Sequence, residues 1–234
     1  MRENLKVVLV QPNLVWENPK ANREKLETLI DGQSGDLFVL PEMFATGFSM
    51  NPSTFSETED GDSVSWMKEL ASKKEAAVVG SLIIKENSNY YNRLLFVHPD
   101  GTYNAYDKRH LFTLAGEEKH YAQGEDSILV EYKGWKIKPL VCYDLRFPVW
   151  SRNTEDYDLL LYVANWPAKR SSAWSALLTA RAIENQSYVI GVNRIGEDGS
   201  GMAHNGKSVA IDALGEDLLI FKEDEEAAKS VVLS

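Results

Sequence analysis

Apolar positions along the chain follow two periods, which together predict alternating strands and helices. Short continuous apolar runs at Leu5–Gln11 and at residues 76–84 are typical of strands buried on both faces. Apolar residues spaced three or four apart predict helices after Pro19, at residues 63–75 and at residues 171–186, the last with a serine cap. The first half of the chain therefore reads as βα units.

From Tyr90 the pattern changes, and two hairpins follow the βα units. Two strands flank the turn Pro99-Asp100-Gly101, and a second pair flanks Lys133-Gly134. Hairpins imply antiparallel pairs within the same sheets. Further strands are predicted at residues 36–42, 158–166 and 188–193, and residues 208–221 with 228–234 read as a final β-meander.

This mixture of elements predicts an α/β fold. Two mixed sheets packed face to face, with helices on their outer faces, would bury the apolar faces of all the strands. The chain shows no internal repeat and no linker rich in Pro, Gly or Ser. We therefore expect a single domain over residues 1–234.

Composition narrows the possible partners. A formal net charge of -10 disfavours nucleic acid and anionic membranes, because both favour clustered Lys and Arg. No apolar run approaches the roughly 18 residues of a membrane span, and the apolar stretch at the chain start is too short for a signal peptide. The single cysteine excludes an intramolecular disulfide and suits a reducing compartment. We expect a cytoplasmic protein with no nucleic-acid or membrane partner.

Three apolar runs end on a reactive side chain: Glu42, Lys108 and Cys142. Groups at strand ends are held by a rigid sheet yet can face a substrate. A base, a cation and a thiol are the parts needed to cleave an amide through a covalent intermediate. These three residues are therefore the candidate catalytic set.

Each member of this set has an alternative interpretation. A lone cysteine in a buried strand is commonly an inert core residue, and Glu42 and Lys108 could be solvated surface charges. The position of Cys142 favours reactivity, since it closes the apolar run and is followed at once by Tyr143 and Asp144. A turn of this kind can expose a nucleophile.

Two other possible sites, for a phosphate and for a metal, are not supported by the surrounding sequence. Residues 201–208, GMAHNGKS, match the phosphate-binding formula G-x-x-x-x-G-K-[ST], but a strand rather than a helix is predicted after Ser208. The spacing of His110, Glu117 and His120 matches no helical or hairpin pair of metal ligands. We expect neither a nucleotide site nor a metal.

Several ordered blocks give the chain a likeness to a known family. The chain resembles the nitrilase, or carbon-nitrogen hydrolase, superfamily, and most of all its omega-amidase branch. The blocks are VLPEMF around Glu42, YDKRHLF around Lys108, VCYDLRFP around Cys142, YVANWP at 162–167 and LLTARAIENQ at 177–186.

This resemblance implies an α-β-β-α sandwich and a set of roles. Glu42, Lys108 and Cys142 fall on the family's catalytic Glu, Lys and Cys. The family's second glutamate falls on Glu117, with Glu118 as the alternative. A homodimer without metal or organic cofactor is implied as well.

The implied reaction is hydrolysis of a small amide through a thioester on the cysteine. Glu42 would serve as base, and Lys108 with the backbone N–H of Tyr143 would stabilise the oxyanion. Arg146 is our candidate for binding a substrate carboxylate, and its alternative is an ion pair with Asp144 or a nearby acid. Phe48 and Trp166 are expected either to line the pocket or to belong to the core.

The resemblance favours an omega-amidase acting on 2-oxoglutaramate or a related 2-oxo acid monoamide. One alternative is another hydrolase of the superfamily, acting on a carbamoyl amine, a different amide or a nitrile. A non-catalytic binding or assembly protein of the same fold is the remaining alternative, but a binder would have no need of the thiol.

Overall fold

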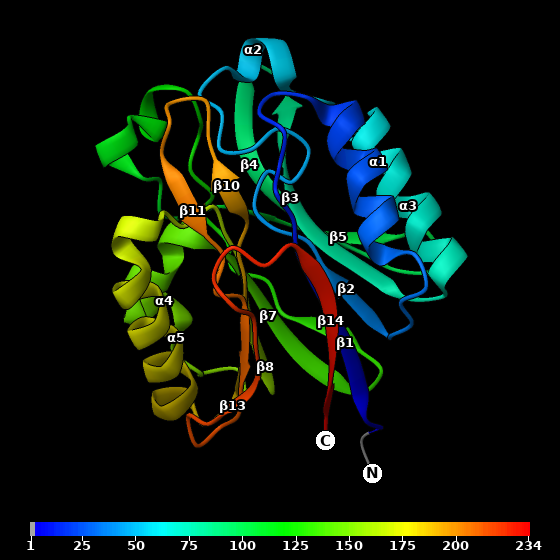
Figure 1. Cartoon of the computed structure of the whole chain (residues 1–234), viewed down its shortest axis with the longest axis vertical. Coiled ribbons are helices and arrows are strands. Elements are labelled where there is room, and N and C mark those ends of the chain that lie inside the picture. The colour runs from blue at the N-terminus through cyan, green and yellow to red at the C-terminus, as the bar shows by residue number, and fades with distance from the viewer. Residues whose placement is uncertain (1–2) are drawn as a thin grey trace.

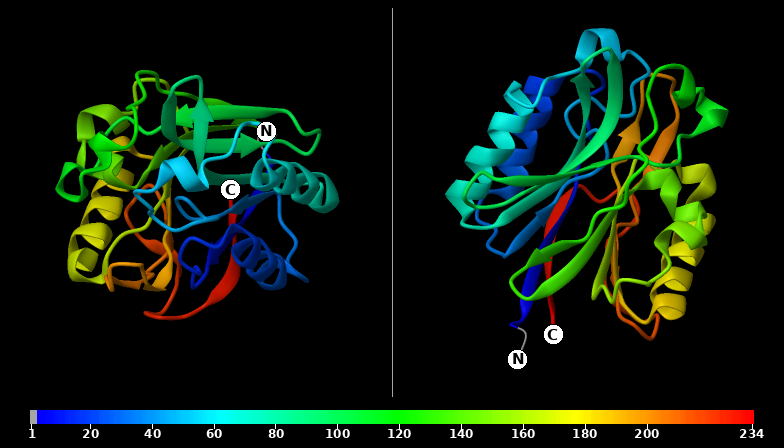
Figure 2. Two further views of the ribbon diagram at one scale, coloured as in Figure 1. Left: turned by 90° about the horizontal axis from the view of Figure 1, so that it is seen from above. Right: turned by 180° about the vertical axis from the view of Figure 1, so that it is seen from behind.

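Two mixed β-sheets pack face to face in the computed structural model, which describes residues 3–234 (Figure 1). Helices cover the outer face of each sheet, so the layers run helix, sheet, sheet, helix (Figure 2). The predicted sandwich is therefore confirmed. The prediction that the chain start is no signal peptide falls partly on residues 1 and 2, which lie outside the described range.

The first sheet has the order β14-β1-β2-β3-β4-β5. Its strands β1, β2 and β3 run parallel, because helices α1 and α3 return the chain across the outer face between them. The hairpins β3–β4 and β4–β5 then add antiparallel strands. The bounds are β1 Leu5–Gln11, α1 Pro19–Ile30, β2 Leu37–Val39, α2 Pro52–Phe55, α3 Asp62–Lys74, β3 Ala77–Glu86, β4 Asn89–Val97 and β5 Tyr103–Asp107.

The second sheet has the order β13-β12-β9-β8-β7-β6, with β7, β8 and β9 parallel. Helix α5 is the crossover between β8 and β9, and the short ribbon β10–β11 stands apart from both sheets. The bounds are β6 Val130–Tyr132, β7 Trp135–Val141, α4 Pro148–Ser151, β8 Leu159–Val163, α5 Ser171–Asn185, β9 Tyr188–Val192, β10 Ile195–Glu197, β11 Ala203–Asn205, β12 Val209–Ile211, β13 Asp217–Ile220 and β14 Ala227–Leu233.

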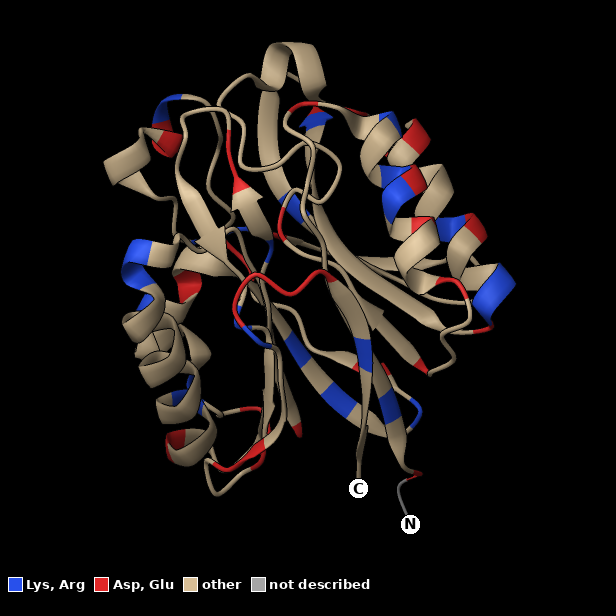
Figure 3. Ribbon diagram, in the orientation of Figure 1, with Lys and Arg blue, Asp and Glu red and all other residues tan. Residues whose placement is uncertain are grey.

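Strand β1 shows why the central strands are apolar on both faces. Val7 and Leu9 point into the core between the sheets, whereas Val8 and Val10 pack against the helices of the outer layer. Because side chains alternate along a strand, one continuous apolar run fills both layers. Figure 3 shows that α1 and α3 carry acidic and basic residues together on their outward faces.

Two predictions about local structure are wrong. Ser171 does not cap α5: it is the first residue of the helix, Arg170 holds the cap position, and no side chain caps this end. The tail is not a meander either, because β14 leaves the second sheet and pairs antiparallel with β1 of the first. Alternation along a strand identifies a strand but not the sheet edge that it joins.

The phosphate-loop match is correctly rejected, because strand β12 and not a helix follows Ser208. Within residues 3–234 no helix combines the length and apolar character needed to cross a bilayer.

Candidate active site

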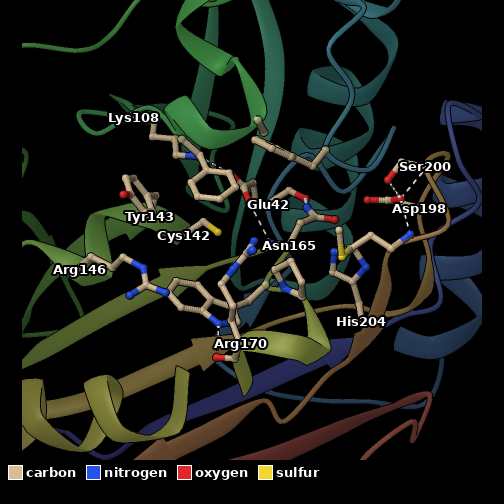
Figure 4. A pocket seen from close by; sticks show the side chains of 16 residues that line it. Glu42, Lys108, Cys142, Tyr143, Arg146, Asn165, Arg170, Asp198, Ser200 and His204 are labelled. Carbon is tan, nitrogen blue, oxygen red and sulfur yellow. Dashed lines mark hydrogen bonds and ion pairs between the residues drawn. The ribbon is translucent and has the colours of Figure 1, made fainter. Parts of the chain in front are cut away.

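The two sheets bring three reactive side chains together (Figure 4). Lys108 directly follows β5, and Cys142 directly follows β7. Glu42 lies in the turn three residues beyond the end of β2. Since β2 and β5 belong to the first sheet and β7 to the second, the site lies at the junction of the sheets.

Cys142 occupies a strained elbow. Its φ is +44°, an unfavourable left-handed conformation for a residue with a side chain, and it opens the short 3-10 helix η3, Cys142–Arg146. Asp144 fixes this turn, because its Oδ2 accepts hydrogen bonds from the backbone N–H of Val141 at 3.0 Å and from Tyr106 Oη at 2.8 Å. The nucleophile is thus held at the point where the strand becomes a turn.

The other carboxylate oxygen of Asp144 pairs with His110, through the ring Nδ1 at 2.7 Å and the backbone N–H at 3.0 Å. The alternative interpretation of Arg146, an ion pair with Asp144 or a nearby acid, is therefore wrong, because Asp144 has other partners and no ion pair among residues 3–234 includes Arg146. The Arg146 guanidinium instead lies over the Trp166 ring, 5.0 Å from its centroid.

Lys108 is fully buried between two carboxylates. Its Nζ lies 2.9 Å from Glu42 Oε1 and 2.9 Å from Glu117 Oε2. Glu117, in the 3-10 helix η2 Glu117–Lys119, is also buried and accepts a hydrogen bond from the backbone N–H of Phe112 at 2.6 Å. Glu118 is exposed, so the structure supports Glu117 as the residue beside the lysine.

Two asparagines complete this arrangement, and sequence reasoning missed both. Asn92, inside strand β4, donates from Nδ2 to Glu42 Oε1 at 2.8 Å and more weakly to Glu117 Oε1 at 3.3 Å. Asn165, just beyond β8, donates its backbone N–H to Glu42 Oε2 at 2.9 Å, and its side chain binds the Glu42 carbonyl. Asn92 is followed by Arg93 and precedes the apolar run of β4, which begins at Leu94, so no break in an apolar run marked it.

Burial controls the ionisation of this cluster. Burial raises the pKa of Glu117, and Lys108 partly offsets that rise. Burial alone would lower the pKa of Lys108, but the charges of Glu117 and Glu42 outweigh it, so its pKa is raised and the ammonium stays charged. Burial, reinforced by the Glu42 carboxylate, raises the pKa of the Cys142 thiol well above its ordinary value. The resting nucleophile is therefore a thiol with a carboxylate beside it.

A cavity of about 140 Å³ opens over Cys142. Phe48, Arg146 and Trp166 line it as expected, Tyr143 lines it as well, and Glu117 lies behind Lys108 rather than in the wall. Trp166 also belongs to the core, so both of its interpretations hold. Sequence reasoning missed the following wall residues: Phe112, Ala115, Pro167, Arg170, Asp198, Ser200, Met202 and His204.

This arrangement has the parts of a nucleophilic hydrolase. A thiol, a carboxylate within reach of it and a buried ammonium face one cavity. The backbone N–H of Tyr143, at the second position of η3, has no partner within that helix, as is general for the N–H groups of a first helical turn.

Comparisons with known proteins agree with this chemistry. A family model described as carbon-nitrogen hydrolase matches residues 6–231. Omega-amidase YafV of Escherichia coli strain K12 is 52% identical over 213 residues, which cover 91% of this chain and 83% of that protein. A 2-oxoglutaramate amidase of Bacillus subtilis strain 168 is 36% identical over 196 residues, covering 81% of this chain and 76% of that protein.

A solved structure is similarly close. The CN-hydrolase superfamily protein XC1258 of Xanthomonas campestris, solved with an arsenic adduct in its active site, superposes with a TM-score of 0.96. It is 42% identical, and the match covers 99% of this chain and 91% of that one.

Proposed function

The chain belongs to the carbon-nitrogen hydrolase family, and on that premise we propose that it is an omega-amidase that hydrolyses a 2-oxo dicarboxylic acid monoamide such as 2-oxoglutaramate. It is an amide hydrolase by family, and the substrate class is the proposed part. The observation that carries the proposal is the buried Glu42–Lys108 pair beside Cys142, in a cavity that also presents the cation of Arg146.

Acylation begins with proton transfer from the Cys142 thiol to Glu42. Because burial and Glu42 raise the thiol pKa, the thiolate forms only as it attacks the amide carbon. Lys108 and the backbone N–H of Tyr143 then stabilise the oxyanion. Glu42 returns the proton to the leaving nitrogen, ammonia departs, and a thioester on Cys142 remains.

Deacylation reverses the roles of the same groups. Glu42 removes a proton from a water molecule, which attacks the thioester carbonyl; the C–S bond breaks, the carboxylic acid leaves, and Glu42 returns the proton to the Cys142 sulfur. Glu117 supports this step indirectly, because it accepts two hydrogen bonds of 2.9 and 3.0 Å from Lys108 Nζ and so keeps the ammonium directed at the cavity. This Glu-Lys-Cys cycle uses no metal and no organic cofactor.

The cavity suits a small anionic substrate. At roughly 10–15 Å³ for each water-sized group, a cavity of about 140 Å³ holds on the order of ten such groups. 2-Oxoglutaramate has about that many heavy atoms. Its carboxylate needs a cation, and Arg146 presents a guanidinium that stacks on Trp166.

We also propose that the enzyme is a cytoplasmic homodimer. The family resemblance implies a dimer, and the outer face of α4 and α5 exposes the apolar side chains of Val149 and Ile183, with exposed fractions of 90% and 53%. Sedimentation of the purified protein tests the dimer, and a concentration-independent monomer would exclude it.

The decisive test of function is ammonia release from 2-oxoglutaramate by the wild type and by a Cys142→Ala variant. We expect release by the wild type only, with the variant retaining the wild-type fold by circular dichroism. Equal release by both would eliminate the covalent mechanism. No release by either would move the search to other amides, carbamoyl amines and nitriles.

A further inference from the structure

One wall of the active-site cavity carries two unpaired cations. The Arg146 and Arg170 side chains both line it, Arg146 from η3 and Arg170 from the 3-10 helix η4, Ala168–Arg170. Over residues 3–234, neither guanidinium forms a hydrogen bond or an ion pair with another residue. Lys108 differs, because two carboxylates already neutralise it.

Aromatic rings hold both guanidinium groups in place. Arg146 lies 5.0 Å from the Trp166 ring centroid, and Arg170 lies 4.9 Å from that of Phe112. The backbone of Arg170 is fixed too, since its carbonyl accepts a hydrogen bond from Trp166 Nε1 at 2.8 Å. A cation over a ring face keeps its N–H donors free for a planar anion.

Arg170 also lies near the nucleophile. Its pKa is lowered, chiefly by burial and further by the charge of Arg146, whereas Cys142 acts in the opposite direction. In Figure 4 the Arg170 side chain projects toward Cys142, and Arg146 lies toward the edge of the pocket. A substrate bound through its amide at Cys142 would therefore pass Arg170 on the way to Arg146.

We propose that Arg170 is a specificity-determining residue that selects 2-oxo acids over 2-amino acids, by donating hydrogen bonds to the 2-oxo oxygen of a substrate whose carboxylate is bound by Arg146. This role rests on the proposed function. In glutamine, a protonated amino group replaces the oxo oxygen and would meet the Arg170 guanidinium. Like charges forced together in a partly buried site are strongly unfavourable.

The opposite wall carries the carboxylate of Asp198, which could attract an ammonium group; Glu42, the other carboxylate of the lining, is already paired with Lys108. Its Oδ1 already accepts hydrogen bonds from Ser200, through the backbone N–H at 2.8 Å and Oγ at 2.7 Å, and from the backbone N–H of Met202 at 2.9 Å. These donors hold Asp198 in its own loop on the wall opposite the arginines, so we place the C2 substituent of the substrate against Arg170 rather than against Asp198.

The test measures kcat/KM for 2-oxoglutaramate, glutamine and glutaric acid monoamide, which has the carboxylate but no substituent at C2. The variants are Arg170→Gln, Arg146→Gln and Lys169→Gln. Lys169 is the matched control, because it adjoins Arg170 and carries the same charge but is exposed and lines no part of the cavity.

We expect Arg170→Gln to lower kcat/KM for 2-oxoglutaramate by about 10- to 100-fold, the effect of losing a hydrogen bond from a charged donor. Its effect on glutaric acid monoamide should stay within about threefold, and glutamine hydrolysis should stay level or rise. Arg146→Gln should impair all three substrates, and Lys169→Gln none.

Two results would overturn the role of Arg170. The first is an equal loss on all three substrates in Arg170→Gln, which would indicate a structural or catalytic part. The second is a wild type that hydrolyses glutamine as well as 2-oxoglutaramate, which would mean that Asp198 and not Arg170 determines which substituent is accepted at C2. Failure of the proposed function looks different, because the wild type would then hydrolyse none of the three.

Discussion

Glu117 and Glu118 form a natural pair for testing the buried cluster. They are neighbours of the same residue type, but Glu117 is fully buried against Lys108 while Glu118 is exposed. Substitution by Gln preserves the shape of the side chain and removes its charge. We therefore compare Glu117→Gln with Glu118→Gln.

The expected loss follows from the acceptors that Glu117 provides. An amide keeps one oxygen, so the hydrogen bonds that Oε2 accepts, from Phe112 N–H at 2.6 Å and from Lys108 Nζ at 2.9 Å, lose their acceptor. Bonds of this kind contribute roughly 1.5–3 kcal/mol each. Burying a carboxylate is itself unfavourable, as the raised pKa of Glu117 indicates, so we expect a net loss of roughly 2–4 kcal/mol in unfolding free energy.

Catalysis should suffer beyond this loss of stability. Without the Glu117 carboxylate, Lys108 can turn toward Glu42 and away from the position of the oxyanion. Loss of one group that stabilises an oxyanion costs roughly 10²–10³ in kcat. The assay is ammonia release at saturating 2-oxoglutaramate, corrected for the folded fraction from urea unfolding curves. The reasoning fails if folded Glu117→Gln keeps more than half of the wild-type kcat, or if Glu118→Gln loses as much.

Two further predictions concern groups around the cavity. Burial lowers the pKa of His204 from 6.5 to about 4. Between these two pH values the unfolded chain protonates the imidazole and the folded protein keeps it neutral. The unfolding free energy therefore falls as the pH drops from 6.5 to 4, by up to about 3 kcal/mol. His204→Gln should flatten the dependence of unfolding free energy between pH 6.5 and 4, and an unchanged slope would contradict this. Asp144→Asn should reduce kcat at least tenfold, because Asp144 Oδ1 and Oδ2 each accept two hydrogen bonds that fix the elbow of Cys142. A variant with wild-type kcat would show that the elbow keeps its shape without these hydrogen bonds.

The strands and the reactive residues could both be predicted from the sequence, and for the same physical reason. Buried parallel strands need continuous apolar runs, and the end of such a run is where a polar side chain stands out. Lys108 and Cys142 follow their strands directly, as predicted, and Glu42 follows within three residues. The neighbouring acid was found as well, since Glu117 rather than Glu118 is buried.

The missed residues depend on contacts between distant segments. Asn92 reaches Glu42 across 50 positions and Asn165 across 123, and no local pattern encodes such distances. Arg170 lies in a single 3-10 turn and Asp198 in the short connection between β10 and β11, and segments this short show no periodicity that gives the position of a side chain. Strand β14 was misassigned for a related reason, because its partner strand lies at the other end of the chain.

The pairing of β14 with β1 has a consequence for how the protein is made. Leu5 pairs with Leu233 and Gln11 with Ala227, so the outer edge of the first strand stays open until the ribosome has released residues 227–233. Strands that pair over such separations form slowly, and their open edges invite association with other chains. The newly made polypeptide therefore passes most of its synthesis with β1 unprotected, in need of shielding from its neighbours.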